Sequence, residues 1–97
     1  MPTVGKASEI ASGQMTGVDL QGVRVAIARV EGAFYAFSDI CTHLGCSLSE
    51  GKLEGMVLTC PCHGSQFDIA SGHVLTGPAV QRIRTYQVQI EGDELRI

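Results

Sequence analysis

The sequence predicts an all-β protein, a small antiparallel sandwich or barrel with a subdomain inserted at about residues 40–68. Short β-branched and aromatic runs alternate with turn signals along most of the chain. Twelve glycines at short intervals are typical of many short strands joined by turns. Apolar residues do not recur at the i, i+3, i+4, i+7 spacing of an amphipathic helix. We therefore expect one domain over residues 1–97, without repeats or linkers.

The first half of the chain contains four predicted strands. In residues 23–30, valine and isoleucine alternate with arginine and alanine, which predicts a strand with one buried face. The Glu31-Gly32 turn signal then joins this strand to the next one in a hairpin. The predicted strands are residues 3–6, 15–20, 23–30 and 33–37, and residues 9–14 are predicted to form a loop.

The second half of the chain contains shorter predicted strands. Residues 48–51 turn the chain, residues 56–59 form a strand, and residues 67–69 lead to another turn in residues 70–72. Residues 82–90 alternate throughout and are predicted as a single half-buried strand. The Glu91-Gly92-Asp93 turn closes a hairpin onto residues 94–97.

The composition excludes several classes of protein. The net charge of −3 argues against nucleic acid as a partner, because nucleic-acid binding requires a basic face. No apolar run approaches the roughly 18 residues of a membrane span, and the first residues show neither a signal-peptide core nor a twin arginine. We therefore expect a soluble, cytoplasmic protein with no membrane partner. Three phenylalanines, two tyrosines and no tryptophan make a marginal core.

The chemistry of the chain is concentrated in two short segments. All four cysteines and two of the three histidines lie in Cys41-Thr42-His43-Leu44-Gly45-Cys46 and Cys60-Pro61-Cys62-His63-Gly64-Ser65. The ligand spacing is Cys-x-His, then sixteen residues, then Cys-x-x-His. Thiolates and imidazoles that arrive in pairs on two tight loops indicate a metal centre, because each loop presents both of its ligands from one side.

Other uses of these cysteines fit the pattern less well. A scaffold held only by disulfides gives no role to histidine beside cysteine. A nucleophilic site needs one activated thiolate rather than two Cys/His pairs. Covalent haem needs Cys-x-x-Cys-His, and Cys60-Pro61-Cys62-His63 has one spacer too few. Structural zinc bound by two cysteines and two histidines stays open on spacing alone.

The residues that flank the ligands favour iron over zinc. Both segments closely resemble the cluster-binding loops of Rieske proteins, in which two cysteines hold one iron of a [2Fe–2S] cluster and two histidines hold the other. The resemblance implies that Cys41 and Cys60 bind one iron and that His43 and His63 bind the second. It extends over essentially all 97 residues and implies the Rieske fold.

The two remaining cysteines, Cys46 and Cys62, lie one in each segment. In the Rieske proteins that carry them, these two cysteines form a disulfide that clamps the loops, so the resemblance implies the same disulfide here. Free thiols are the alternative, since the cytosol usually keeps thiols reduced. A buried disulfide of low reduction potential resists the glutathione pool.

Four further residues are expected to tune the cluster. Pro78 belongs to the segment 76–79, which resembles a third loop that covers the cluster in Rieske domains. Leu44 is expected to shield the cluster from water. Ser65 occupies the position of a serine that hydrogen-bonds sulfur in high-potential members, whereas Phe67 replaces a tyrosine that does the same. The resemblance thus implies an intermediate potential within the family range of roughly −150 to +300 mV.

A cluster held by four side chains leaves no open coordination position for a substrate, so we expect one-electron transfer rather than catalysis. The chain is similar to soluble Rieske-type ferredoxins, which pass electrons from a flavin-dependent NAD(P)H reductase to a terminal, often ring-hydroxylating, oxygenase. A small Rieske subunit of a larger oxidoreductase, similar to arsenite oxidase or a cytochrome bc-type complex, is the alternative that the paired extra cysteines favour. A zinc-stabilised interaction module is the third hypothesis.

Several other polar or aromatic residues are expected to have no role at the centre. His73 lies in a predicted turn, and Asp39 and Asp68 flank the two segments, so all three are expected to be solvated. Tyr35 and Tyr86 lie in strand patterns and are expected to pack in the core.

Overall fold

The structure is a computed structural model that describes residues 3–42, 45–62 and 64–97. Every strand pairing within these ranges is antiparallel, which confirms the predicted all-β class. The strands form three sheets, in the orders β1-β11-β10, β2-β3-β4-β9 and β5-β6-β7-β8. The strands are β1 Thr3–Lys6, β2 Met15–Leu20, β3 Val23–Val30, β4 Ala33–Ser38, β5 Lys52–Glu54, β6 Val57–Thr59, β7 Gln66–Asp68, β8 Val74–Thr76, β9 Thr85–Tyr86, β10 Gln89–Glu91 and β11 Glu94–Arg96, and two short 3-10 helices are η1 Ala7–Glu9 and η2 Leu48–Glu50.

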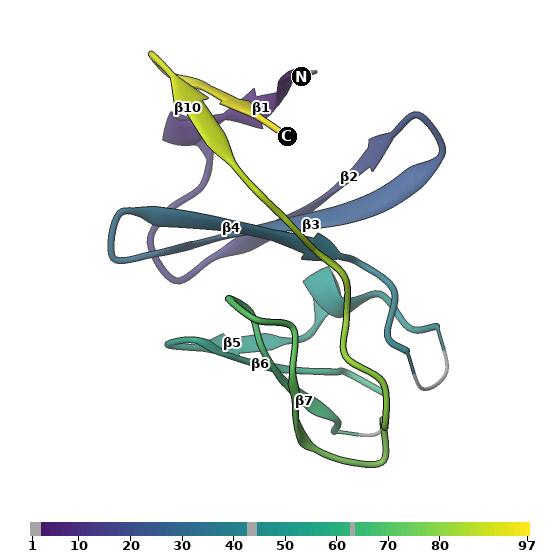
Figure 1. Ribbon diagram of the computed structural model, residues 1–97. Coiled ribbons are helices and arrows are strands. Elements are labelled where there is room, and N and C mark those ends of the chain that lie inside the picture. The colour runs from purple at the N-terminus through teal and green to yellow at the C-terminus, as the bar shows by residue number, and fades with distance from the viewer. Residues whose placement is uncertain (1–2, 43–44, 63) are drawn as a thin grey trace.

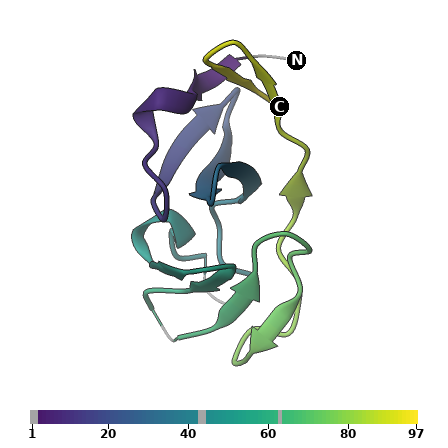
Figure 2. The same cartoon turned by 90° about the vertical axis from the view of Figure 1, so that its left-hand side faces the viewer.

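The three sheets are stacked along the molecule. The sheet of β1, β11 and β10 lies at the end that carries both chain termini, the sheet of β2, β3, β4 and β9 lies in the middle, and β5 to β8 lie at the opposite end (Figure 1). The same order is visible after a quarter turn (Figure 2). No helix within the described ranges is long and apolar enough to cross a membrane.

The middle sheet is built from two tight hairpins that the sequence signals. Leu20 pairs with Val23 across Gln21-Gly22, and β3 turns into β4 across Glu31-Gly32. The two central residues of each turn have positive φ, 52° and 87° in the first and 51° and 84° in the second. This is the type I′ geometry, whose twist matches that of the flanking strands. The predicted turn at Glu31-Gly32 is therefore confirmed.

Strand β3 is buried on both faces, and the expectation of one buried face is wrong. Val25 and Ile27 pack in the core between the middle sheet and the β1-β11-β10 sheet. Ala26 and Ala28 are equally buried on the other face, in the core shared with the β5–β8 sheet. Alanine is too small to mark a core face by hydrophobicity, but it allows the second sheet to pack closely against this one.

The predicted single strand over residues 82–90 is also wrong. This segment divides into β9, which pairs with β4, and β10, which pairs with β11 in a different sheet. Ile83 is buried in the core beside the β5–β8 sheet, whereas Tyr86 and Val88 pack against the other core. The alternation of polar and apolar residues continues while the chain passes from one sheet to another, so alternation alone does not reveal the break.

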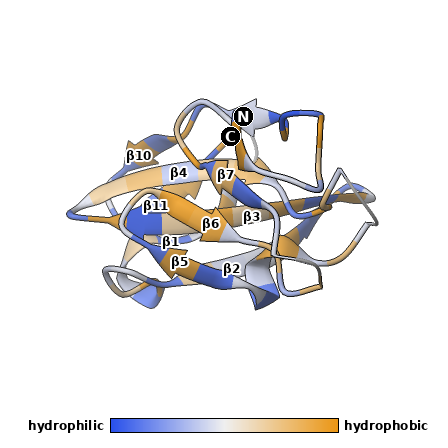
Figure 3. Ribbon diagram, turned by 90° about the horizontal axis from the view of Figure 1, so that it is seen from below, coloured by the Kyte–Doolittle hydropathy of each residue, from blue (hydrophilic) through white to orange (hydrophobic). Residues whose placement is uncertain are grey.

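The β5–β8 sheet lies within the second half of the chain and carries its own buried strands. Leu58 on β6 pairs with Phe67 on β7, and both are fully buried. Figure 3, which views the molecule from this end, shows β6 coloured as hydrophobic. Strand β8, which the sequence pattern did not predict, extends this sheet to Thr76, beyond the expected limit of residue 68 for the inserted subdomain. The subdomain as a separate unit stays a prediction.

Candidate metal centre

The first cysteine-containing segment, residues 41–46, forms a tight loop between β4 and η2. We call it the first loop. The Cys41 N–H donates to the Cys46 carbonyl at 2.9 Å, and the Gly45 N–H donates to the Cys41 carbonyl at 2.9 Å. These two bonds close the loop on itself and hold the Cys41 backbone at its base.

The second segment, residues 60–65, forms the second loop between β6 and β7 and closes in the same way. The Cys60 N–H donates to the Ser65 carbonyl at 2.8 Å, and the Gly64 N–H donates to the Cys60 carbonyl at 3.3 Å. The fifth residue of both loops has a left-handed backbone, with φ of +75° at Gly45 and +77° at Gly64. Glycine is favoured there because it has no Cβ atom to make this conformation unfavourable. The described residues of the two loops therefore share the same hydrogen-bond pattern and the same backbone conformation at the fifth position.

Each loop begins with a cysteine that is hidden from water. Cys41 and Cys60 are each 3% exposed and belong to the core between the middle sheet and the β5–β8 sheet. Neither of them takes part in the disulfide described next. Two thiols at equivalent positions of two equivalent loops, both sheltered by the core, provide soft sulfur ligands of the kind that iron–sulfur clusters use.

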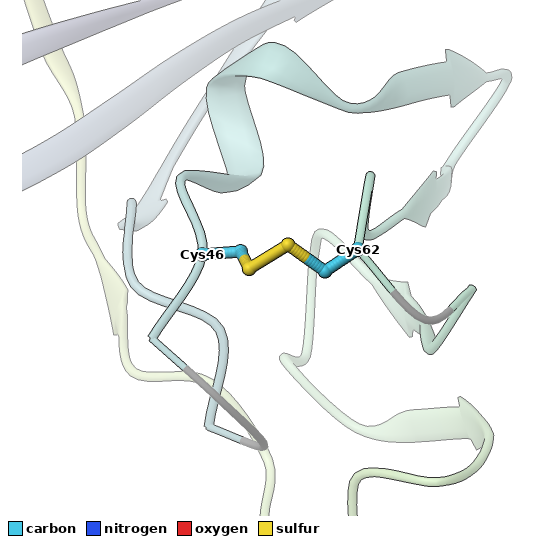
Figure 4. The surroundings of a disulfide bond; sticks show 2 residues. All are labelled: Cys46 and Cys62. Atoms are coloured by element: carbon cyan, nitrogen blue, oxygen red, sulfur yellow. A yellow bond between two sulfur atoms is a disulfide. The ribbon is translucent and has the colours of Figure 1, made fainter.

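A disulfide joins the two loops. It links Cys46 at the end of the first loop to Cys62 in the middle of the second, with the Cα atoms 6.4 Å apart (Figure 4). Cys62 is exposed and Cys46 is partly exposed, in contrast to the buried pair. The predicted pairing is confirmed. The predicted ligands His43 and His63 and the predicted shield Leu44 lie outside the described residues.

A third loop, residues 77–82, is hydrogen-bonded to both of the others. The Ala79 N–H donates to Ser65 Oγ of the second loop at 3.0 Å. The Thr42 hydroxyl of the first loop donates to the Gln81 carbonyl at 2.6 Å. Pro78 is exposed beside the buried Ala79. This loop is therefore bonded to both the first and the second loop, and its expected role as a cover for the cluster stays a prediction.

The structure places the two predicted tuning residues of the second loop and β7 inside the core. Ser65 is 1% exposed and Phe67 is fully buried. Because the Ser65 oxygen accepts the Ala79 bond, its one O–H hydrogen is left to donate to another acceptor. The tuning roles of Ser65, Phe67, Pro78 and Leu44 stay predictions.

Asp39 is a functional candidate that the sequence pattern did not reveal, and its expected solvation is wrong. Its side chain is fully buried at the base of the first loop. One oxygen accepts the Ser49 N–H at 2.6 Å, and the other accepts Arg24 Nη2 and Ser47 Oγ, each at 2.9 Å. Burial alone would raise the pKa of Asp39, but these hydrogen bonds outweigh it and lower the pKa below 3.8, so the group is a carboxylate at neutral pH.

The remaining expectations for surface and core residues hold in part. His73 is exposed, as expected, and Asp68 is partly buried. The Asp68 carboxylate accepts the N–H groups of Ala70 and Ser71, at 2.8 and 3.2 Å, and thereby closes the turn after β7. Tyr35 packs against one core, which agrees with the expected core role.

These features define a class of protein: a small all-β domain that presents two buried cysteines, suitable sulfur ligands for a metal centre, on paired, disulfide-linked loops. The model of the Rieske [2Fe-2S] domain matches residues 1–87. The chain therefore belongs to the Rieske [2Fe–2S] domain family, and its cofactor is a Rieske-type [2Fe–2S] cluster.

Comparison with individual proteins places the chain near two kinds of Rieske protein. It is 42% identical, over 92% of its length and 86% of the relative's, to the ferredoxin component of the naphthalene 1,2-dioxygenase system of Pseudomonas aeruginosa. It is 35% identical to the cytochrome b6-f complex iron-sulfur subunit of Chlorobaculum thiosulfatiphilum, over 98% of this chain and 51% of that protein. The structure of a complex of reduced oxygenase and oxidized ferredoxin in carbazole 1,9a-dioxygenase contains a similar chain, with a TM-score of 0.93, 33% identity and 98% of both chains covered.

Proposed function

We propose that this protein is a soluble, cytoplasmic Rieske ferredoxin that carries single electrons from a flavin-dependent NAD(P)H reductase to a terminal ring-hydroxylating oxygenase. The observation that carries the proposal is the length over which the chain matches a dioxygenase ferredoxin component. The chain corresponds over nearly its whole length, and over most of the relative's, to a dioxygenase ferredoxin component. The similar chain in the oxygenase–ferredoxin complex supports an oxygenase as the electron acceptor.

The cluster would be held by the four side chains that the resemblance to the Rieske loops implies. Cys41 and Cys60 would bind one iron, and His43 and His63 would bind the other. The two cysteine donors fit the group, because they are buried at equivalent places in paired loops. When bound, a cluster of this kind accepts and releases one electron, and its neutral imidazole ligands raise its potential above that of all-cysteine clusters.

The chain's own residues would control the surroundings of that centre. The core around Cys41 and Cys60 excludes water from the sulfur side. The Cys46–Cys62 disulfide and the third loop keep the two ligand loops at a fixed separation. A rigid site changes little between oxidation states, and this favours rapid electron exchange with both partners.

A second function has one specific observation in its favour. That observation is the Cys46–Cys62 disulfide, and a cytochrome b6-f complex iron-sulfur subunit is among the similar proteins. A small Rieske subunit of a larger oxidoreductase is therefore the alternative. It predicts a large subunit that copurifies with the chain at constant ratio, whereas a ferredoxin purifies alone.

The test combines spectroscopy with electron delivery. Purified protein should be red-brown and, after dithionite, should give a rhombic EPR signal with an average g value below that of all-cysteine clusters. With the reductase and oxygenase components of a naphthalene 1,2-dioxygenase system, it should support NAD(P)H-dependent substrate oxidation that ceases when it is omitted. A colourless protein that contains zinc and no iron would refute the proposal and support the zinc-stabilised module. A Rieske EPR signal without electron delivery to the oxygenase would instead support the alternative of a subunit of a larger oxidoreductase.

A further inference from the structure

Asp39 is the only fully buried charged side chain in the part of the chain that the structure describes. A buried ion pair is a poor source of stability, because the cost of removing the charges from water offsets most of their attraction. Its partner Arg24, 2.9 Å away, has a side chain that is 45% exposed. The pair is therefore asymmetric, with the negative charge inside and the positive charge half in solvent.

Asp39 lies two residues before Cys41 in the chain. Asp39 is fully buried and Cys41 is 3% exposed, whereas Ile40 between them is 44% exposed. Two residues of chain span at most about 7 Å, so the Cα atoms of Asp39 and Cys41 are close neighbours. The buried carboxylate therefore belongs to a residue that lies close to a proposed cluster ligand.

Residues 47–49, which directly follow the first loop, hold the Asp39 carboxylate in place. Ile40 and Ser47 form an antiparallel bridge, and the Leu48 N–H donates to the Asp39 carbonyl at 2.8 Å. The Ser47 hydroxyl and the Ser49 N–H bind the carboxylate directly. Ser47 directly follows the disulfide residue Cys46. A fixed negative charge therefore lies at the base of the loop that carries Cys41.

We propose that the Asp39–Arg24 pair sets the reduction potential of the cluster by charge: the buried Asp39 lowers it, and the half-exposed Arg24 partly cancels that effect. The inference rests on the proposed electron-transfer function. An electron added to the cluster is repelled by a nearby buried anion, which makes reduction less favourable. Two charges roughly 10 Å apart, at an effective dielectric constant of about 20, change such an equilibrium by roughly tenfold. Solvent screens Arg24 more than Asp39, so the two effects do not cancel completely.

The test uses variants that change charge with little change of shape. Asp39→Asn should make the cluster easier to reduce, and Arg24→Met should make it harder to reduce, by a smaller amount. The potential is measured by voltammetry on the iron-loaded protein. Arg24→Lys keeps the charge and should leave the potential close to that of the wild type. Ser47→Ala removes a hydrogen bond without removing a charge, and it should shift the potential by less than Asp39→Asn.

A distant ion pair provides the matched control. Arg96 and Glu94 on β11 are 3.0 Å apart and lie in the sheet at the other end of the molecule. Glu94→Gln should leave the potential unchanged, whereas the Asp39→Asn shift should persist in high salt because the carboxylate is buried.

The outcomes separate this inference from the proposed function. Opposite shifts in Asp39→Asn and Arg24→Met support the inference. Shifts in the same direction, or unchanged potentials beside a lowered melting temperature, would show that the pair acts only on loop structure and would overturn it. If Asp39→Asn fails to fold, Arg24→Met and Arg24→Lys still decide the sign. A wild-type protein without the Rieske EPR signal would refute the proposed function itself.

Discussion

Removing the Cys46–Cys62 disulfide should cost this protein a large part of its stability. The two cysteines are 16 residues apart in the sequence. The chain-entropy model gives about 3 kcal/mol for closing a loop of this length, because the cross-link restricts the unfolded chain. For a domain of this size, each kcal/mol corresponds to roughly 4–8 °C in melting temperature. We therefore expect the double variant Cys46→Ala/Cys62→Ala to melt roughly 15 °C below the wild type.

The assay is thermal unfolding of both proteins at equal iron content, followed by circular dichroism in the far-ultraviolet and by the visible absorbance of the cluster. Wild-type protein treated with an excess of a dithiol serves as the second arm, because the exposed Cys62 makes the disulfide accessible to the reagent. Its melting temperature should fall to that of the double variant. A double variant that melts within about 3 °C of the wild type would refute the reasoning, since it would mean that the disulfide does not restrict the unfolded chain.

Three further predictions concern single residues. Phe67→Tyr adds a hydroxyl at the position where high-potential Rieske proteins donate to sulfur, and voltammetry should show a higher potential; an unchanged value would contradict the hydrogen-bond argument. Gly51→Ala would bring a Cβ atom against the Thr59 carbonyl, so chemical denaturation should show a loss of at least about 2 kcal/mol. Gly55→Ala is the control: its Cβ would meet nothing within 4 Å, so only the positive φ of residue 55 should cost stability, up to about 1 kcal/mol. Hydrogen bonds from Ser8 lower the pKa of Asp93, so their contribution to folding stability is present above pH 3.8 and is lost as the pH falls through the lowered pKa. In the Ser8→Ala variant, NMR titration should show an Asp93 pKa that has moved back toward 3.8.

The two cysteine-containing loops and the disulfide between them were the most predictable part of the molecule. Cysteines and histidines at fixed spacing, flanked by glycines, carry their chemistry in the sequence itself, so the two loops could be predicted from the motif. The Cys46–Cys62 pairing followed from the resemblance of that motif to the Rieske loops. The hairpin turn at Glu31-Gly32 was predictable for a different reason, because few residue pairs suit that turn geometry.

The features that escaped prediction depend on contacts between distant segments. The role of Asp39 depends on Arg24, fifteen residues away, and on the return of the chain at Ser49. An aspartate beside a loop is usually solvated, so nothing local marked it as buried. The break in residues 82–90 and the burial of Ala26 likewise follow from how the sheets stack, and a one-dimensional pattern contains no information on stacking.

The pairing of β1 with β11 determines how this molecule can be attached to a second protein or to a surface. Thr3 lies opposite Arg96, so the first and last strands run side by side at the end of the molecule away from the disulfide-linked loops (Figure 1). A linker joined to either terminus would leave the loops unobstructed. A reductase fused there, or a surface tether for single-molecule work, would hold the protein at the end opposite the disulfide-linked loops. The loops would then remain accessible to a freely diffusing electron acceptor.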